Sequence, residues 1–249
     1  MGKTRAAMAA LGAVLLTAGC GRLGFGGGDP QGAEAANAAR APLERRLAAK
    51  GFKTGARVHI RVFKAENRLE LWLSDGGRYG LFETYPICRW SGTAGPKIKE
   101  GDGQAPEGFY AVRPAQMNAA SKYHRAFNLG FPNAYDQALG RTGSALMVHG
   151  ACVSVGCYAM TDPAIDEIFT LMEGAFAGGQ NEIAVDALPF RFDGGANEAP
   201  AGRWAGFWSD LAEGDRIFHD TGRPAPAFTC QGRYRFEGGP GCRTVREAD

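Results

Sequence analysis

Residues 147–160 read Met147-Val148-His149-Gly150-Ala151-Cys152-Val153-Ser154-Val155-Gly156-Cys157-Tyr158-Ala159-Met160. The apolar residues before His149 predict a short buried strand that ends at this histidine. Seven residues separate His149 from Cys157, and a loop of that length can fold back and bring the two side chains together. A thiol attacks a carbonyl as the thiolate, and an adjacent imidazole can take its proton. The spacing is therefore compatible with a cysteine enzyme that has Cys157 as nucleophile and His149 as base. A small buried cysteine and a hydrogen-bonded structural histidine are the alternatives on spacing alone.

The residues around this pair support the same chemistry. Gly150 and Gly156 let the backbone turn sharply and direct N–H groups into the site, where they would stabilise an oxyanion. A helix is expected directly afterwards, because Asp162 can cap it and Pro163 suits its first position. Five residues at helical spacing form its apolar face: Ile165, Ile168, Phe169, Met172 and Phe176. The dipole of this helix favours a thiolate at Cys157.

Alternating apolar residues predict a core of antiparallel strands. The expected strands are 57–63, 68–73, 79–87, 106–112, 145–149 and 183–192, of which the first two form a hairpin. Residues 42–50 are expected to form a short helix, 114–124 to be partly helical, and 127–132 to form a strand and a turn. The pattern indicates an α+β domain that is rich in strands.

The N-terminus has the features of a signal peptide. Lys3 and Arg5 form a positive head, and the small and apolar run of residues 6–19 is too short to cross a bilayer as an ordinary helix. The run leads into Leu16-Thr17-Ala18-Gly19-Cys20, which resembles the lipobox of bacterial lipoproteins. We expect removal of residues 1–19 and lipidation of Cys20. Cleavage at a small-residue site and an uncleaved leader that acts as a weak anchor are the alternatives.

Residues 20–41 are rich in Gly and Ala without apolar periodicity, which predicts a flexible tether. The charge balance argues against nucleic acid as a partner. The chain carries 28 basic and 26 acidic residues, and loss of residues 1–19 would leave 26 of each. A protein near neutrality without a basic stripe is not typical of nucleic-acid binding.

Five cysteines follow Cys20, and their odd number leaves at least one thiol unpaired. Cys230 and Cys242 flank a glycine-rich turn and can close a small loop. Cys88 with Cys152 is a possible second bridge, which would leave Cys157 free. Two other uses of these residues are weaker. His149, Cys152 and Cys157 offer three irregularly spaced metal ligands, and a Cys152–Cys157 redox pair lacks the Cys-x-x-Cys spacing.

Several motifs together resemble the L,D-transpeptidase (YkuD-type) catalytic domain family. Ser154-Val155-Gly156-Cys157 with His149 upstream is similar to its Ser/Thr-x-Gly-Cys signature, and Pro106-Glu107-Gly108-Phe109-Tyr110 to its Pro-x-Gly-x-Phe strand. Further segments resemble its YafK-like branch of murein transpeptidases: Tyr85-Pro86-Ile87-Cys88, Gly95-Pro96-Lys97, Glu100-Gly101-Asp102, Asn128-Leu129-Gly130-Phe131-Pro132-Asn133 and Tyr135-Asp136-Gln137. The resemblance covers about residues 55–192.

This resemblance implies a β-rich α+β catalytic domain over residues 42–193, with mixed or antiparallel sheets and the main helix after the nucleophile loop. Residues 194–249 are expected to form an irregular appendage that docks through Trp204, Phe207 and Trp208. The resemblance also assigns roles at the site. Cys157 would be the nucleophile and His149 the base, Ser154 and Gly156 would shape the loop, and backbone amides near Gly156 and Cys157 would form the oxyanion hole.

The sequence departs from the family pattern in two respects. The histidine lies closer to the cysteine than is typical, and Ala159 stands where an arginine is often found two residues after the cysteine. That arginine could hold a carboxylate of the stem peptide, so another residue must take its role. Five residues are candidates for binding substrate: Arg125, Arg141, Lys97, Gly150 and Tyr158.

The resemblance implies an acyl-transfer enzyme that acts on peptidoglycan stem peptides at the cell envelope or in the periplasm, held to the membrane by its lipid anchor. No metal or organic cofactor is expected. Transfer to an amine gives transpeptidation. Transfer to water gives an amidase that releases lipoproteins or other amines from peptidoglycan. The alternatives of another class are a non-catalytic peptidoglycan-binding lipoprotein and a thiol oxidoreductase with a Cys152–Cys157 disulfide.

Overall fold

The computed structural model of the protein describes residues 1, 29–38, 41–192 and 201–247. The predicted signal peptide after Met1, the predicted lipidation site Cys20 and half of the predicted tether, residues 20–28 and 39–40, lie outside the described residues. None of the helices in the described part is both long and apolar enough to cross a bilayer.

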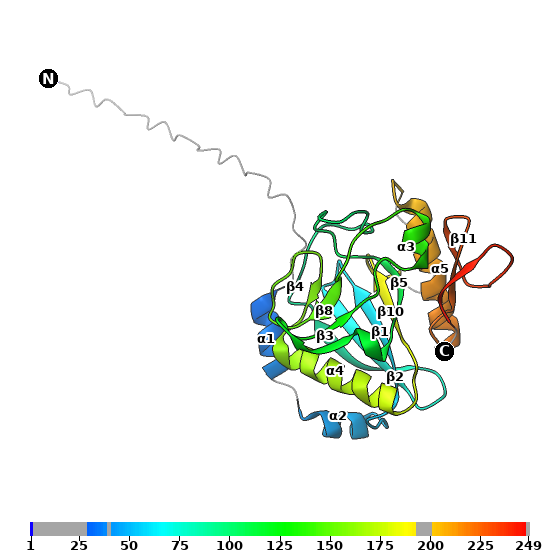
Figure 1. Ribbon diagram of the computed structural model, residues 1–249. Helices are drawn as coiled ribbons and strands as arrows, with labels where there is room; N and C mark the ends of the chain where they lie inside the picture. Colours follow the sequence, from blue (N-terminus) through cyan, green and yellow to red (C-terminus); the bar gives the residue numbers. More distant parts are fainter. Residues whose placement is uncertain (2–28, 39–40, 193–200, 248–249) are drawn as a thin grey trace.

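A five-stranded sheet forms the centre of the molecule (Figure 1). Its order is β3 (Gly80–Pro86), β2 (Arg68–Ser74), β1 (Arg57–Phe63), β10 (Ile183–Leu188) and β5 (Gly108–Val112). Strands β1 and β10 are parallel and the other pairs are antiparallel, so the sheet is mixed. The alternating residues of β1 and β2 that predicted the hairpin are fully buried: Val58, Ile60, Val62, Leu69, Leu71 and Leu73.

A second five-stranded sheet carries the residues singled out by the sequence. Its order is β4 (Arg89–Trp90), β9 (Tyr158–Ala159), β8 (Met147–His149), β7 (His124–Asn128) and β6 (Met117–Ser121). The helical part expected within residues 114–124 is the single turn of 3-10 helix η1 (Pro114–Gln116), and most of the remainder pairs as the hairpin β6–β7. Most of β6 is exposed, so its polar composition reflects an outer strand and not a helix.

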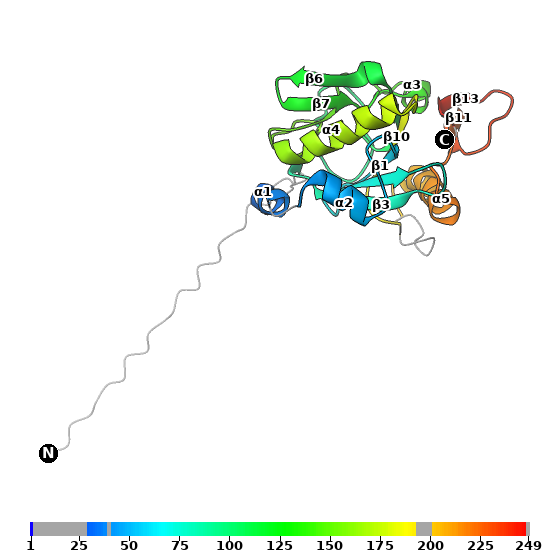
Figure 2. The same cartoon turned by 90° about the horizontal axis from the view of Figure 1, so that it is seen from below.

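Helix α4 (Asp162–Ala177) joins the two sheets. Figure 2 shows it between the layer of β6 and β7 and the layer of β1 and β3. Its buried face includes the predicted residues Ile165, Ile168, Phe169 and Met172. The capping residue is Thr161 and not Asp162, since the Thr161 hydroxyl accepts a hydrogen bond from the Ala164 amide. Asp162 instead accepts one from the Ala151 amide at 2.7 Å, which ties the helix to the nucleophile loop.

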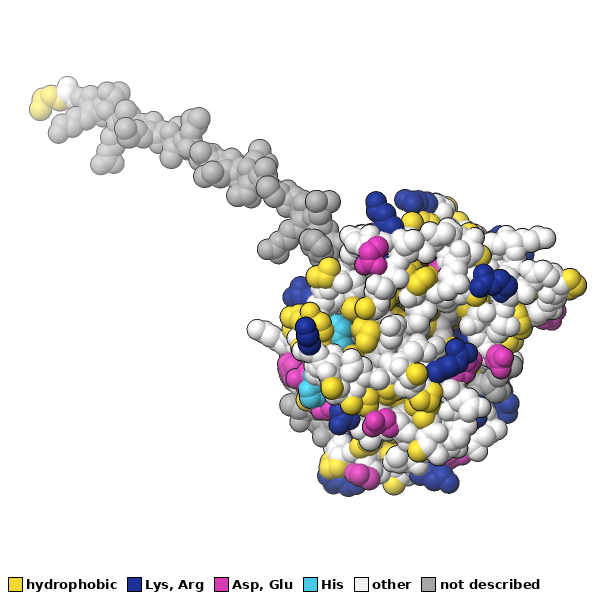
Figure 3. Space-filling view, in the orientation of Figure 1, with side chains coloured by type: hydrophobic (Ala, Val, Ile, Leu, Met, Phe, Trp, Pro, Cys, Tyr) yellow, Lys and Arg dark blue, Asp and Glu magenta, His cyan; other side chains and the backbone are white. Residues whose placement is uncertain are grey.

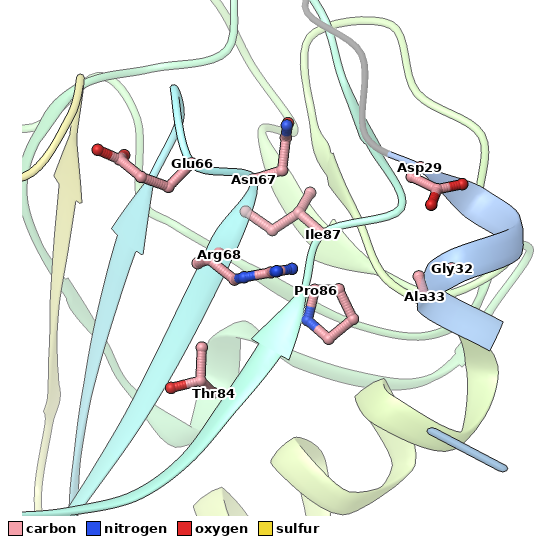
Figure 4. Close-up of a pocket in the computed structure, with 9 residues that line it drawn as sticks. All are labelled: Asp29, Gly32, Ala33, Glu66, Asn67, Arg68, Thr84, Pro86 and Ile87. Carbon is pink, nitrogen blue, oxygen red and sulfur yellow. The ribbon is translucent and has the colours of Figure 1, made fainter. Parts of the chain in front are cut away.

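Two short helices precede the sheets. Helix α2 (Leu43–Ala49) agrees with the predicted helix over 42–50. Helix α1 (Pro30–Ala38) lies where a flexible tether was expected, and it buries Ala33. A hollow of about 530 Å³ lies between α1 and the ends of β2 and β3 (Figure 4). In that view Arg68 extends from β2 alongside Pro86, and Asp29 stands at the start of α1 on the other side.

The C-terminal appendage is regular, contrary to expectation. It consists of α5 (Ala205–Thr221) and a three-stranded sheet in the order β12 (Arg233–Arg235), β11 (Ala227–Cys230), β13 (Arg243–Arg246), with α3 (Ala134–Ala138) packed nearby. Its abundant Gly and Pro suggested irregularity, yet most of them lie between elements. Gly214 is an exception on the buried face of α5, where a Cβ would lie 2.4 Å from Phe109 of β5. That face buries Phe207 and Leu211 in a shared core with Phe109.

The docking of the three aromatic residues is confirmed. Phe207 is buried, Trp208 donates its Nε1–H to Glu107 at 2.9 Å, and Trp204 lies against Gly95. Two buried ion pairs join the appendage to the central sheet as well. Arg61 of β1 pairs with Asp215 of α5, and Arg246 of β13 pairs with Asp186 of β10. The appendage and the catalytic domain therefore share one interior.

A buried lysine organises the long loop between β4 and β5. The Lys64 ammonium is fully buried and donates to the carbonyls of Thr93, Gly95 and Ala105 and to the Glu107 carboxylate at 2.9 Å. Burial lowers the pKa of Lys64, while the adjacent Glu107 raises it. Because every donor is used, the ammonium can remain charged in the interior.

We predict that Glu107→Leu lowers the free energy of unfolding by about 3–5 kcal/mol, because it leaves the Lys64 ammonium buried without its counter-ion. Urea unfolding followed by tryptophan fluorescence measures this change. The double variant Lys64→Met/Glu107→Leu removes both charges and should be more stable than Glu107→Leu alone. A double variant that is equally unstable would contradict the role given to the ion pair.

Candidate active site

The parallel pairing of β8 and β9 brings the predicted nucleophile and base together. Val148 pairs with Tyr158 and His149 with Ala159, so Cys157 directly precedes the strand next to the one that His149 ends. Cys157 lies just outside β9, two residues before the partner of His149. Strand spacing and rise separate such a pair of Cα atoms by roughly 8 Å. An imidazole and a thiol can span this distance.

The hydrogen bond of His149 determines which ring nitrogen is the base. The ring is buried, and its Nδ1 lies 2.7 Å from the carbonyl oxygen of Gly150. A carbonyl only accepts, so Nδ1 carries the proton and Nε2 holds the lone pair. Burial lowers the pKa of His149, against the opposing effect of the Gly150 carbonyl. The imidazole is therefore neutral near pH 7 and ready to accept a proton.

The Cys157 thiol is partly buried and is the free cysteine of the described residues. Its sulfur accepts a hydrogen bond from the Met147 amide at 3.4 Å and lies 3.8 Å from the Ala145 carbonyl oxygen. Burial raises the pKa of the thiol, while the Met147 amide and the Lys97 charge lower it. The thiol and the imidazole are thus both neutral at rest.

The loop before the cysteine is braced by hydroxyl groups. The Ser154 hydroxyl accepts from the Cys157 amide at 3.0 Å and donates to the Cys157 carbonyl at 2.7 Å. Gly156 has φ +92°, a conformation that strains any residue with a Cβ, and its amide donates to the Ser91 hydroxyl. The expected oxyanion hole is therefore not preformed, because the Gly156 and Cys157 amides already have hydroxyl partners.

Both expected disulfides are confirmed, Cys88–Cys152 and Cys230–Cys242. The first ties the middle of the nucleophile loop to the segment between β3 and β4. Because Cys152 is bonded to Cys88, the redox pair Cys152–Cys157 is wrong.

The three basic candidates for substrate binding form ion pairs with acidic side chains of the protein. Arg141 is buried and pairs with Asp136 at 2.8 Å. Lys97 is buried and pairs with Asp102 at 2.6 Å. Arg125 is half-exposed, and its Nε lies 3.2 Å from the Asp166 carboxylate. Arg141 has a structural role, and Lys97 acts on Cys157 through its charge.

The other two candidates are interior residues. Tyr158 is fully buried and donates its hydroxyl proton to the Pro106 carbonyl at 2.6 Å. Gly150 is packed so closely that a Cβ would lie 2.5 Å from Asp162 Oδ1 and 3.1 Å from Ile165. The structure favours packing roles for both residues over contact with a substrate.

A family model described as the L,D-transpeptidase catalytic domain (YkuD) matches residues 57–187, from β1 to β10. The chain belongs to this family. It is also 44% identical over 181 residues to the protein named "Putative L,D-transpeptidase YafK" of Escherichia coli K12. That overlap covers 72% of this chain and 74% of the relative, and the protein of the same name from E. coli O157:H7 gives the same values. The membership that the motifs predicted is confirmed.

Solved structures overlap the chain more loosely. The helical cell shape determining protein Pgp2 of Campylobacter jejuni is 20% identical, with a TM-score of 0.43 over 68% of this chain and 60% of that one. Its K307A variant gives a TM-score of 0.44 over 70% and 63%. Mycobacterium tuberculosis L,D-transpeptidase 1 is 14% identical, with a TM-score of 0.30 over 55% and 64%. The chain thus spans less than two thirds of each of these structures.

The structure adds residues to the L,D-transpeptidase site that the sequence did not indicate. The Tyr123 ring packs on His149 with centroids 4.9 Å apart, from the tip of the β6–β7 hairpin. Tyr123, Val153 and Val155 are all exposed, so they give the site an apolar rim. Apolar side chains gathered beside a histidine are visible on the face in Figure 3. Nothing in the polar segment around Tyr123 signals this contact, which depends on strand pairing.

The hollow beside α1 in Figure 4 does not belong to this site, since neither His149 nor Cys157 lines it. A smaller hollow of about 420 Å³ lies nearer the nucleophile, between the loop that carries Gln104 and the start of α5. It is lined in part by Lys99, Arg203 and Trp204.

We predict that the alkylation rate of Cys157 rises with pH to a midpoint above the ordinary thiol pKa of about 8.5. Burial raises the pKa of this thiol, so the reactive thiolate is scarce at neutral pH. Iodoacetamide labelling followed by mass spectrometry measures the rate without reducing the disulfides. A midpoint below pH 7 would instead indicate a resting thiolate–imidazolium pair.

Proposed function

We propose that the protein is a peptidoglycan L,D-transpeptidase that works by acyl transfer through Cys157. One observation carries this proposal. In a chain of the L,D-transpeptidase family, the free Cys157 thiol directly precedes β9, the strand that pairs with the one that His149 ends. The hydrogen bond of His149 Nδ1 leaves Nε2 as the ring nitrogen with the lone pair. A nucleophile beside an oriented base is the arrangement that covalent catalysis requires.

The proposed reaction begins when the Cys157 sulfur attacks a stem-peptide carbonyl and its proton passes to His149 Nε2. The new C–S bond gives a tetrahedral oxyanion. Collapse of this intermediate breaks the C–N bond, and the departing amine takes the proton from Nε2. A thioester on Cys157 remains. An acceptor amine then attacks the thioester while His149 takes its proton, and the sulfur leaves and regains a proton.

The hydrogen bonds of the loop hold Cys157 in position. The remaining activation of the thiol must come with the binding of substrate. Ser154 fixes both the amide and the carbonyl of Cys157. Because the amides of Gly156 and Cys157 bond to hydroxyl groups, the oxyanion must displace a hydroxyl or use another donor. The Met147 amide, which already lies 3.4 Å from the sulfur, is directed at the reacting centre.

We also propose that the protein acts at the cell envelope as a lipoprotein anchored through Cys20. The positive head, the short apolar run and the lipobox-like residues before Cys20 support this location. Both disulfides suit an oxidising compartment outside the cytoplasm. Peptidoglycan lies in the same compartment.

We predict that the purified protein converts tetrapeptide muropeptides to cross-linked dimers and that Cys157→Ala abolishes this turnover. Mass spectrometry of muropeptides incubated with each protein measures the products. Ser144→Ala is the control, because this side chain is exposed. Release of amine without dimers would identify water as the acceptor and the protein as an amidase. Full turnover by Cys157→Ala would exclude Cys157 as the nucleophile.

We predict that activity on the acid side is lost only below the ordinary histidine pKa of about 6.5. The base works when neutral, and burial lowers the pKa of His149, so the neutral form persists as the pH falls. The pH dependence of kcat/KM reports this group in the free enzyme. An acid limb centred above pH 7 would contradict the buried, neutral histidine.

A further inference from the structure

The hollow between the long loop and the start of α5 has a rigid floor. The Gln104 side-chain amide donates to the carbonyls of Thr93 and Gly95, the latter at 2.6 Å, and so closes the loop on itself. Gly95 has φ +129°, and a Cβ there would lie 2.6 Å from Trp204 Nε1. Only glycine therefore lets Trp204 pack this closely on the loop.

A single segment of chain separates this floor from the nucleophile loop. The Ser91 hydroxyl accepts from the Gly156 amide, and the Ser91 carbonyl accepts from the Ala105 amide at 2.9 Å. The Gln104 carbonyl oxygen lies 4.0 Å from where a Cβ of Gly156 would be. The Lys97 charge also acts on the Cys157 thiol from the same loop. A peptide bound at Cys157 can thus extend into the hollow.

The hollow carries positive charge without a neutralising acid. Asp102 lies in its lining, but both carboxylate oxygens are used, Oδ1 by Lys97 and Gln104 and Oδ2 by the amides of Ile98 and Lys99. The side chains of Lys99 and Arg203 are exposed, and neither pairs with a carboxylate among the residues that the structure describes.

Arg203 is held in place for recognition of an anion. Its guanidinium lies 4.3 Å from the centre of the Trp204 ring, and this stacking restricts its orientation while leaving its N–H groups accessible. A planar guanidinium binds a carboxylate through two parallel hydrogen bonds, and a nearby ammonium adds a third charge-assisted contact. The basic residues nearer the cysteine differ, because Arg125, Arg141 and Lys97 all face carboxylates of the protein itself.

We propose that Arg203 and Lys99 bind a free carboxylate of the stem peptide, with the Trp204 ring as the apolar wall beside it. This inference rests on the proposed function and names its carboxylate subsite. The C-terminal appendage then contributes directly to substrate binding. The appendage then binds the carboxylate that an arginine two residues after the cysteine could hold in the family. This chain has Ala159 at that position.

Binding to the catalytically inactive Cys157→Ala protein tests this proposal without any turnover. Isothermal titration calorimetry with a stem tetrapeptide should show that Arg203→Gln weakens binding about tenfold or more, and Lys99→Gln by a smaller factor. Arg216→Gln is the matched control, because Arg216 lies on α5, just after the turn that carries Arg203, and pairs with Asp220. Its affinity should equal that of the Cys157→Ala parent.

Peptides in which each carboxylate in turn is converted to the carboxamide identify the bound group. One such peptide should bind the parent about tenfold more weakly and show no further loss with Arg203→Gln. Equal affinity of Arg203→Gln and the parent for the unmodified peptide would overturn the subsite and leave the proposed function standing. No binding of any stem peptide to the parent would overturn both.

Discussion

One buried ammonium holds the walls of the site in place. Lys64 donates hydrogen bonds to three carbonyls of the loop between β4 and β5 and to the Glu107 carboxylate. Glu107 in turn accepts from the Gly95 amide at 2.7 Å and from Trp208 of α5. A desolvated ion pair adds little net stability by itself, but the loss of either partner leaves a buried charge. The ion pair therefore selects one arrangement of the loop and the appendage over alternative arrangements.

That arrangement determines the geometry of the nucleophile through a second set of polar contacts. Ser91, at the start of the same loop, accepts from the Gly156 amide, and Ser154 closes a ring of hydrogen bonds on Cys157. Asp162 holds the Ala151 amide from the other side. The loop between His149 and Cys157 is consequently held by the long loop, by α4 and by a disulfide. These contacts fix the backbone on both sides of Cys157.

The sequence predicted features that depend on local pattern. The alternation in β1 and β2, the apolar face of α4 and the Cys230–Cys242 bridge are visible as spacings of residues, whereas Cys88–Cys152 was one possible pairing. The sequence did not predict the features that depend on tertiary contacts. Residues 117–121 form an outer strand only because β7 lies beside them. Tyr123 reaches His149, and Trp204 reaches Gly95, across long stretches of chain. No spacing near the cysteine could reveal that Arg125 faces Asp166, or that Arg203 of the appendage has no carboxylate partner among the described residues.

The protonation state of the dyad follows from burial and suits the surroundings of the site. Burial raises the pKa of the Cys157 thiol and lowers the pKa of the His149 imidazole, so both shifts favour the neutral pair. A permanent thiolate five residues from the Cys88–Cys152 bridge would be a ready nucleophile for disulfide exchange. A protonated thiol is inert towards that bridge. The same burial that makes the thiol less reactive therefore keeps the loop intact.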